Sequence, residues 1–386
     1  MSKITLWSII LGLAIGTGHL TKLRVLNLIG PSEVLFGIFA IYILVKHGKR
    51  IFSFEFNSLE GLIKILLFLN IFIFTPIMTM INILILKLPQ STPEYMFSFF
   101  IGWILLFGVY VLYKENNINM KTVALTSSII FITTNLISLF FFPNLSMYSE
   151  TRFEGFAKNP NQIVFYSTTI LILIFMYIKG FTKYTLAGLI IYIGILAGSD
   201  AYNLTLFVFV FMFFILNFTR FFKVNYKIKL LGLILIVLII SACILIVYHN
   251  EVLSLWYSAD EGAEETGGGR LVLYLNSMKA LILSPIIGFG LGQLSGFSRP
   301  FEGMEVHNTF LDFSLQFGLI FSFLVYSIIL YSSYKAFKEK NYLFSSFIIS
   351  YVILGLFHYY GRHFIFWIEL SIFYSYIFNK NKSIRM

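Results

Sequence analysis

The stretch LIKILLFLNIFIFTPIMTMINILIL, residues 62–86, decides the fold class of this chain, and Lys64 is its only charged residue. At about 1.5 Å of rise per residue, a helix of this length can cross the roughly 30 Å hydrocarbon core of a bilayer. Every backbone polar group in hydrocarbon needs an internal partner, so the segment has to be helical. The stretch therefore predicts a transmembrane helix.

The composition of the whole chain has the same bias. Of its 386 residues 58% are hydrophobic and 12% charged, and its mean hydropathy is +0.85, far outside the range of soluble globular proteins. We predict an all-α polytopic membrane protein with about twelve transmembrane helices, forming a single membrane domain over residues 1–386. The predicted spans are residues 4–20, 31–46, 62–86, 95–113, 122–142, 161–178, 184–198, 201–218, 229–248, 308–333, 342–360 and 363–379.

The basic residues predict the orientation. With the amino terminus in the cytoplasm, 19 of the 28 Lys and Arg residues fall in inside segments. The positive-inside rule then places both termini in the cytoplasm. The net charge of +10 is explained by these topology signals and by contact with anionic membrane lipids, so we predict no nucleic-acid partner.

Two predicted outside loops are long, residues 143–160 and residues 249–307. Long loops are uncommon in compact bundles and often have a function. The outside segments are rich in arginine, and a single planar guanidinium can bind two phosphate oxygens at once. These arginines either recognise an anion or are ordinary loop residues, and Arg152 in particular could form only a local ion pair with Glu154. The outside arginines are Arg24, Arg152, Arg270, Arg299 and Arg362.

The longer loop contains three glycines, residues 267–269, followed by Arg270. Leu271, Tyr274 and Met278 then repeat at helical spacing, which predicts an amphipathic helix over residues 271–282 at the outer interface. The glycines would lead into its amino terminus, where free N–H groups and the helix dipole favour an anion. A flexible hinge is the alternative. A Walker loop is excluded, because the Gly-Lys-Ser/Thr ending is missing and the loop is outside.

His307 and Asn308 stand where the next predicted span begins, with Asp312 about one helical turn further on. They are either functional or a polar cap at the membrane interface. The sequence has no His-Glu-x-x-His motif, no cysteine pair and no dense carboxylate cluster. We therefore predict no metal site and no cofactor.

Two stretches together resemble the signature region of the O-antigen polymerase and ligase superfamily of membrane glycosyltransferases. They are GGGRLVLYLNSMKALILSPIIGFGLG, residues 267–292, and HNTFLDFSLQFGLI, residues 307–320. A third stretch, RFEGFAKNPNQ at residues 152–162, is similar to an Arg-x-x-Gly, Asn-Pro-Asn segment of many of these polymerases. The matching residues are Arg152, Gly155, Asn159, Pro160, Asn161, Arg270, Pro285, Gly288, Gly290, His307, Asn308 and Gly318.

The chain also departs from the family pattern. The family often has a Ser-Arg pair ahead of the large loop, whereas this chain reads AGSDAY at residues 197–202, with Asp200 in place of the arginine. The usual clamp of two arginines on a diphosphate is therefore in doubt. Arg152 or Arg299 could take the role of the second arginine.

The resemblance implies a GT-C-like, metal-independent glycosyltransferase of the bacterial cytoplasmic (inner) membrane, acting on the outer, periplasmic face. It would transfer a glycan from undecaprenyl diphosphate to a sugar hydroxyl of another lipid-linked glycan. A chain-length regulator and a flippase of the same pathway are the expected protein partners. The implied catalytic residues are Arg270 and His307, and the implied substrate-binding residues are Arg152, Arg299, Asn308, Asp200 and Arg362.

Three alternatives remain at this stage. The chain could be a ligase that transfers the glycan to the lipid A core, although the large loop and the Arg152 segment favour a polymerase. It could be a flippase for the same glycan, but no internal repeat is seen and Glu369 is the main deep ionisable residue. The aromatic stretch at residues 358–366 could bind acceptor sugar or form an interfacial aromatic belt.

Overall fold

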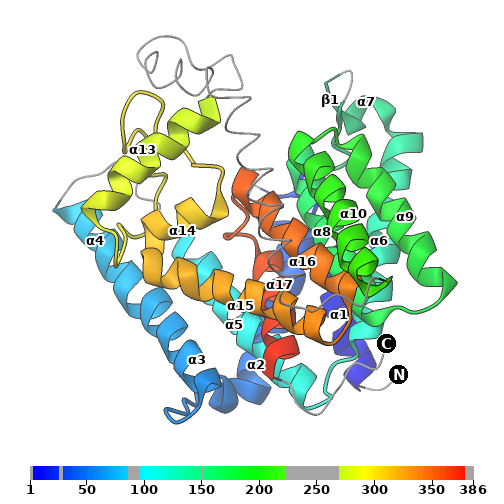
Figure 1. Ribbon diagram of the computed structural model, residues 1–386, viewed down its shortest axis with the longest axis horizontal. Helices are drawn as coiled ribbons and strands as arrows, with labels where there is room; N and C mark the ends of the chain where they lie inside the picture. The colour runs from blue at the N-terminus through cyan, green and yellow to red at the C-terminus, as the bar shows by residue number, and fades with distance from the viewer. Residues whose placement is uncertain (1–2, 26–28, 86–94, 150–151, 222–268, 379–386) are drawn as a thin grey trace.

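The computed structural model describes residues 3–25, 29–85, 95–149, 152–221 and 269–378. These residues are mostly helical and form a bundle (Figure 1). The predicted span at residues 229–248 and two glycines of the large loop, residues 267 and 268, lie outside the described residues.

Helices in the described ranges begin and end close to the predicted spans. A 3₁₀ turn, Thr21–Leu23, follows α1, and a π-helical segment, Asn70–Phe74, joins α3 to α4. A short strand β1 (Met147–Ser149) pairs antiparallel with β2 (Arg152–Phe153), a small ribbon that the all-α prediction lacks. The helices are α1 (Lys3–Gly16), α2 (Pro31–Ile51), α3 (Leu59–Leu69), α4 (Thr75–Leu84), α5 (Tyr95–Lys114), α6 (Met120–Phe141), α7 (Pro143–Ser146), α8 (Pro160–Tyr177), α9 (Phe181–Leu196), α10 (Asp200–Phe221), α13 (Gly269–Leu283), α14 (Thr309–Phe317), α15 (Leu319–Lys338), α16 (Tyr342–Phe357) and α17 (Phe364–Phe378).

Length and composition make many of these helices suitable for a bilayer. In the described part of the chain, six are long and apolar enough to cross a membrane, and α1, α9, α16 and α17 are apolar but shorter. This is the pattern of an all-α membrane protein. The six are Leu59–Leu84, Tyr95–Lys114, Met120–Phe141, Pro160–Tyr177, Asp200–Asn217 and Leu319–Lys338.

Aromatic side chains fill the interior between α5 and α17. Trp103 and Trp367 are fully buried, and the ring of Phe99 meets that of Trp367 edge to face at 6.0 Å. Gly102 lets the two helices approach, because a Cβ there would lie 2.5 Å from the Trp367 ring. Such small residues promote close helix packing in lipid, where the hydrophobic effect between helices is lost.

The single span predicted over residues 308–333 is wrong, because the structure divides it into α14 and α15 at Gly318. Gly318 has a φ of 86°, a conformation that favours glycine. A Cβ at this position would overlap the carbonyl oxygen of Ile286, and the next amide, Leu319 N–H, donates to the carbonyl of Pro285 at 2.8 Å. Contact with a distant loop therefore breaks the helix, a cause that the local apolar pattern does not reveal.

The same loop explains the other glycines of the signature region. Gly288 has a φ of 68°, and a Cβ there would lie 2.7 Å from the Gln316 carbonyl carbon. The Gly290 amide donates to the Gln316 carbonyl at 3.0 Å, and a Cβ on Gly290 would overlap the backbone of Thr79. The Leu291 amide donates to the Thr79 hydroxyl at 2.8 Å. These glycines allow the loop to wedge between the end of α14 and α4.

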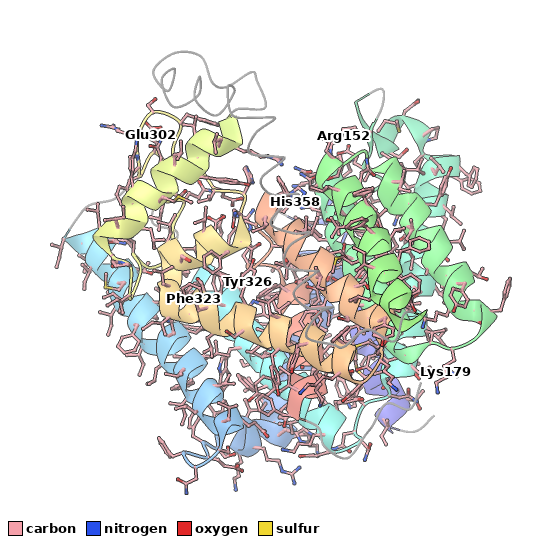
Figure 2. All side chains as sticks on the ribbon, viewed as in Figure 1. Arg152, Lys179, Glu302, Phe323, Tyr326 and His358 are labelled. Atoms are coloured by element: carbon pink, nitrogen blue, oxygen red, sulfur yellow. The ribbon has the colours of Figure 1, made fainter. Side chains whose placement is uncertain are left out.

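The segments predicted to be outside lie at one end of the bundle. Figure 1 shows β1, α7 and α13 at the same end, and in Figure 2 Arg152 and Glu302 are found there. Lys179, predicted to be inside, lies at the opposite end (Figure 2). The two long loops therefore share one end of the molecule, where their polar residues can form a site.

Candidate functional site

His358 is the residue around which the predicted site assembles. It directly follows α16 and is 4% exposed, and its Nε2 atom has no hydrogen-bond partner among the described residues. Burial lowers the pKa of His358 to about 3, with further lowering by the charges of Arg270, His307 and Arg152. Such effects fade with distance, so the side chains of Arg270, His307 and Arg152 lie in the same region of the protein as the His358 imidazole. His358 is neutral at pH 7.

Arg152 reaches the site from the short β ribbon. Its Nε–H donates to the carbonyl of Ala197 at 3.2 Å, and its Nη2 atom donates to the Asn161 side-chain oxygen at 3.5 Å. Gly198, with a φ of 60°, lies beneath the side chain, and a Cβ there would be 3.1 Å from the Arg152 Cγ. The turn between α9 and α10 thus supports the arginine.

The position of Arg152 matters for Asp200, which stands where the family pattern has an arginine. Asp200 is exposed at the start of α10, immediately after the turn that supports Arg152. Arg299 is different, since its side chain is 82% exposed and forms an ion pair at 3.6 Å with Glu302. Figure 2 places Glu302 and Arg152 on opposite sides of this end of the bundle. Arg152 and Arg299 therefore occupy different parts of this end of the bundle, and of the two only Arg152 is among the charges that lower the pKa of His358.

The loop that carries Arg152 is fixed by other contacts. Glu154 pairs with Lys22 at 2.5 Å, so the local ion pair considered for Arg152 and Glu154 is not what the structure records. The Lys22 ammonium also donates to the carbonyl of Leu145 at 2.5 Å. Asn159 caps α8 by accepting from the Asn161 amide at 2.9 Å. Arg152 therefore lies on a loop that these contacts hold in place, and Glu154 forms its ion pair with Lys22 rather than with Arg152.

Arg270 occupies the first turn of α13 and is exposed. The helix predicted over residues 271–282 is confirmed as α13, Gly269–Leu283. The Tyr274 hydroxyl donates to the carbonyl of Leu356 at 2.6 Å and ties the helix to the end of α16. This contact holds the Arg270 end of α13 near His358.

His307 lies in the loop before α14 with a φ of 57°, which is uncommon outside glycine and often found at functional sites. Burial lowers its pKa, Glu305 opposes the shift, and Arg270 and Arg362 add to it. The neutral imidazole is therefore favoured near pH 7. Its half-buried position leaves part of the ring accessible.

The helix cap considered for His307 and Asn308 is formed by Asn308. Its side-chain oxygen accepts from the Leu311 amide at 3.1 Å. Asp312, one turn further on, accepts from the Val306 amide at 3.4 Å. The hydroxyl of Thr309, the residue after Asn308, donates a hydrogen bond to the carbonyl of His358 at 2.6 Å. These bonds fix the backbone on both sides of His307 and join it to the His358 turn.

Arg362 is engaged within the protein. It forms an ion pair with Glu305, and its Nη1 atom donates to the Tyr95 hydroxyl at 3.3 Å. Its guanidinium lies over the rings of Tyr95 and Tyr359, with centroids at 5.4 and 5.8 Å. Although burial opposes it, the Glu305 carboxylate raises the pKa of Arg362. Arg362 thus links three segments near the site, and its predicted contact with substrate stays a prediction.

The sequence pattern assigned no role to His358, which begins the aromatic stretch at residues 358–366. The available signal was its position near the end of the predicted span 342–360, four residues before Arg362. Tyr359 and Tyr360 in this stretch are 4% and 3% exposed, so they do not form the lipid-facing aromatic belt considered above. Their burial also keeps them from stacking on a sugar.

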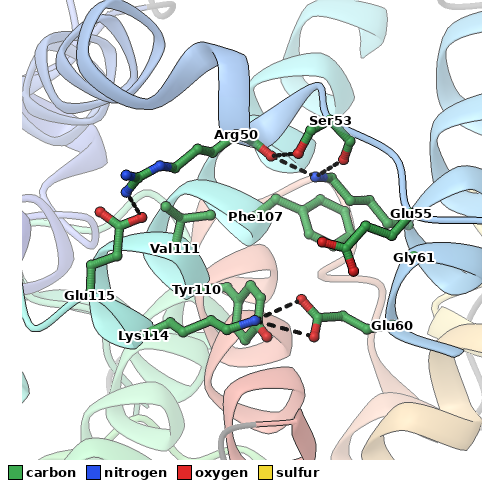
Figure 3. Close-up of a pocket in the computed structure, with 11 residues that line it drawn as sticks. Arg50, Ser53, Glu55, Glu60, Gly61, Phe107, Tyr110, Val111, Lys114 and Glu115 are labelled. Atoms are coloured by element: carbon green, nitrogen blue, oxygen red, sulfur yellow. Dashed lines mark hydrogen bonds and ion pairs between the residues drawn. The ribbon is translucent and has the colours of Figure 1, made fainter. Parts of the chain in front are cut away.

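A separate cavity of about 400 Å³ lies at the other end of α5 (Figure 3). Tyr95 at the start of α5 touches Arg362, whereas Lys114 at its end lines the cavity, roughly 30 Å away along the helix. Four of its charged residues pair internally, Arg50 with Glu115 and Lys114 with Glu60 at 3.4 Å. This cavity is therefore distinct from the site at His358.

Within the ranges that the structure describes, no group of three or more His, Cys, Asp or Glu residues is arranged to hold a metal ion. The cationic groups around His358 instead suit an anion. No protein-family model matches this chain, and no curated protein matches it.

Proposed function

We propose that this chain polymerises O-antigen-type repeat units of a surface polysaccharide, taking each glycan from undecaprenyl diphosphate. One observation supports the proposal above the others. Arg152, Arg270 and His307 come from three separate segments; hydrogen bonds from Tyr274 to Leu356 and from Thr309 to His358 bring the last two to the end of α16, and the charges of both arginines lower the pKa of His358. The resemblance in the sequence selects these same three residues. A cluster of this kind suits a diphosphate-bearing substrate.

The proposed reaction is a substitution at the anomeric carbon of the donor. The oxygen of an acceptor hydroxyl forms a bond to C1, while the bond between C1 and the diphosphate oxygen breaks and its electron pair leaves with the diphosphate. Arg270 and Arg152 stabilise the negative charge that grows on the leaving group. Donors fixed in advance where charge develops lower the barrier, because they strengthen most in the transition state.

The acceptor hydroxyl must lose its proton. His307 is proposed as the general base, since the lowered pKa leaves its imidazole neutral and able to take this proton at pH 7. His358 is buried and neutral, and it is assigned no direct contact with the substrate. Asn308 is assigned to positioning, because its side chain caps α14 beside His307.

A direct test measures lengthening of a lipid-linked glycan by purified protein. Arg270→Ala and His307→Ala variants should each lose about 100-fold or more in rate, the usual effect of removing one transition-state donor. Membrane insertion and thermal melting would first be shown to match the wild type. Normal rates in both folded variants would refute the assignment.

The same assay separates the alternatives. A flippase cannot lengthen glycan in detergent, where no second compartment exists. The deep acidic residue that would favour transport, Glu369, accepts hydrogen bonds from Thr169 at 2.6 Å and from Tyr351, so packing alone accounts for it. A ligase would differ in the cell: deleting a polymerase gene leaves single repeat units on the surface lipid, whereas deleting a ligase gene leaves none.

A further inference from the structure

A groove of about 640 Å³ lies between α9, α10 and the start of α16. Its walls are mainly apolar and include Ile191, Val210, Phe213 and Phe214. Lys340 at its rim precedes α16, whereas His358 follows the other end of that helix, roughly 24 Å away. The groove is therefore at the end of α16 opposite the candidate site.

The charge of the groove is all of one sign. Lys183 and Lys340 line it, and the described lining residues include no Asp or Glu. Across the described ranges, neither lysine has a carboxylate within ion-pair distance. The contact recorded for Lys183 is with the ring of Phe175, at 6.0 Å from the centroid. This differs from the cavity beside Lys114, where cations and carboxylates pair.

We propose that this groove is a binding site for an anionic glycerophospholipid. Lys183 and Lys340 bind the phosphate, and an acyl chain lies against the apolar walls formed by α9 and α10. Because α10 is long and apolar enough to cross a membrane, lipid would be the abundant occupant of a groove that runs along this helix. Lysines at the edge of the hydrocarbon attract anionic headgroups, and the apolar part gives the site its lipid character.

The structure offers a way to block the groove without disturbing the protein. Gly188 lines it, and a Cβ added there would meet nothing within 4 Å. Gly188→Leu should therefore fill the groove while leaving the helix intact. Gly37 in α2 is a matched control, because a Cβ there also meets nothing within 4 Å and the residue is not part of the groove.

The experiment measures phospholipid retained by the full-length protein in detergent, by native mass spectrometry after incubation with phosphatidylglycerol or with phosphatidylcholine of identical chains. The wild type should retain phosphatidylglycerol preferentially. Lys183→Gln and Lys340→Gln should each lower its affinity about fivefold and together about 25-fold, given the usual contribution of one lysine near an anionic headgroup. Gly188→Leu should abolish specific retention, and Gly37→Leu and the exposed Lys121→Gln should leave it unchanged.

Three outcomes would overturn the proposal. Equal retention of the two lipids would show that the lysines do not select charge. Complete displacement of phosphatidylglycerol by millimolar inorganic phosphate would indicate a site for a free anion. Retention unaffected by Gly188→Leu and by the lysine substitutions would mean that the lipid binds elsewhere, or that another part of the protein fills the groove. None of these results depends on glycosyl transfer.

Discussion

Arg362 forms an ion pair with Glu305, and this contact joins the loop before His307 to the turn between α16 and α17. The side chains are 29% and 14% exposed, so neither charge is well solvated. His358 is four residues before Arg362, and His307 is two residues after Glu305. The ion pair therefore holds the segment of His307 close to the segment of His358. Its contribution to the free energy of unfolding can be tested without any assumption about the substrate.

Removing one partner should cost more than removing both. Glu305→Gln leaves Arg362 partly buried without its counter-charge, and we expect a loss of about 2–4 kcal/mol in the free energy of unfolding. Replacing both residues, with Glu305→Gln and Arg362→Met, should recover part of that loss, giving a coupling of about 1–3 kcal/mol. Denaturant titration of the four proteins in detergent measures it. Additive effects would show that the pair contributes little.

Arg152 and Arg299 offer a matched comparison for the diphosphate site. Arg152→Gln should lower the rate of glycan lengthening about 100-fold, because the guanidinium proposed to stabilise the leaving group is lost. Arg299→Gln should change the rate by less than about twofold, since Arg299 is exposed and its partner Glu302 lies on the side of this end of the bundle opposite Arg152. If the order of the two effects were reversed, Arg299 would be the second arginine.

Acid should destabilise the protein partly through His358. Its pKa in the folded protein is about 3, below the ordinary 6.5, so the unfolded chain binds the proton first. The part of the folding stability that depends on a neutral His358 is complete above about pH 6.5, and it is lost as the pH falls towards 3. Between pH 7 and pH 5 the loss is about 2 kcal/mol.

Substituting the histidine provides the check on this pH dependence. His358→Gln cannot be protonated, so its fall in unfolding free energy between pH 7 and pH 5 should be about 2 kcal/mol smaller than that of the wild type. Unfolding in detergent at the two pH values gives both numbers. An unchanged pH dependence would show that His358 is accessible to protons in the folded state.

Gly318 should tolerate no side chain. Gly318→Ala combines a left-handed backbone with overlap on the Ile286 carbonyl, and we expect a loss of about 3 kcal/mol or more, or failure to insert. Gly37→Ala, in open space on α2, should be neutral or stabilising by up to about 1 kcal/mol. Thermal melting in detergent compares them. Equal melting temperatures would show that α14 and α15 can rejoin as one helix.

The sequence alone determined the helical elements, because apolar runs of about 20 residues admit only helices in a bilayer. The helix at Arg270 followed equally from its spacing, whereas the choice of Arg152, Arg270 and His307 as site residues came from the resemblance and stays a prediction. The break at Gly318 did not follow, since a glycine within an apolar run is compatible with an unbroken helix. Only the contact with residues 285–291 decides it.

Tertiary structure also decided which polar residues belong together. Local pattern sets a helix face, but distances between segments depend on how the helices pack. Packing brought Arg152 to the turn before Asp200, paired Arg362 with Glu305, and left Arg299 with Glu302. It also made His358, one histidine among several in the sequence, the buried group on which the charges of Arg152 and Arg270 act. Long-range packing and burial, which are not encoded by residue spacing, selected that residue.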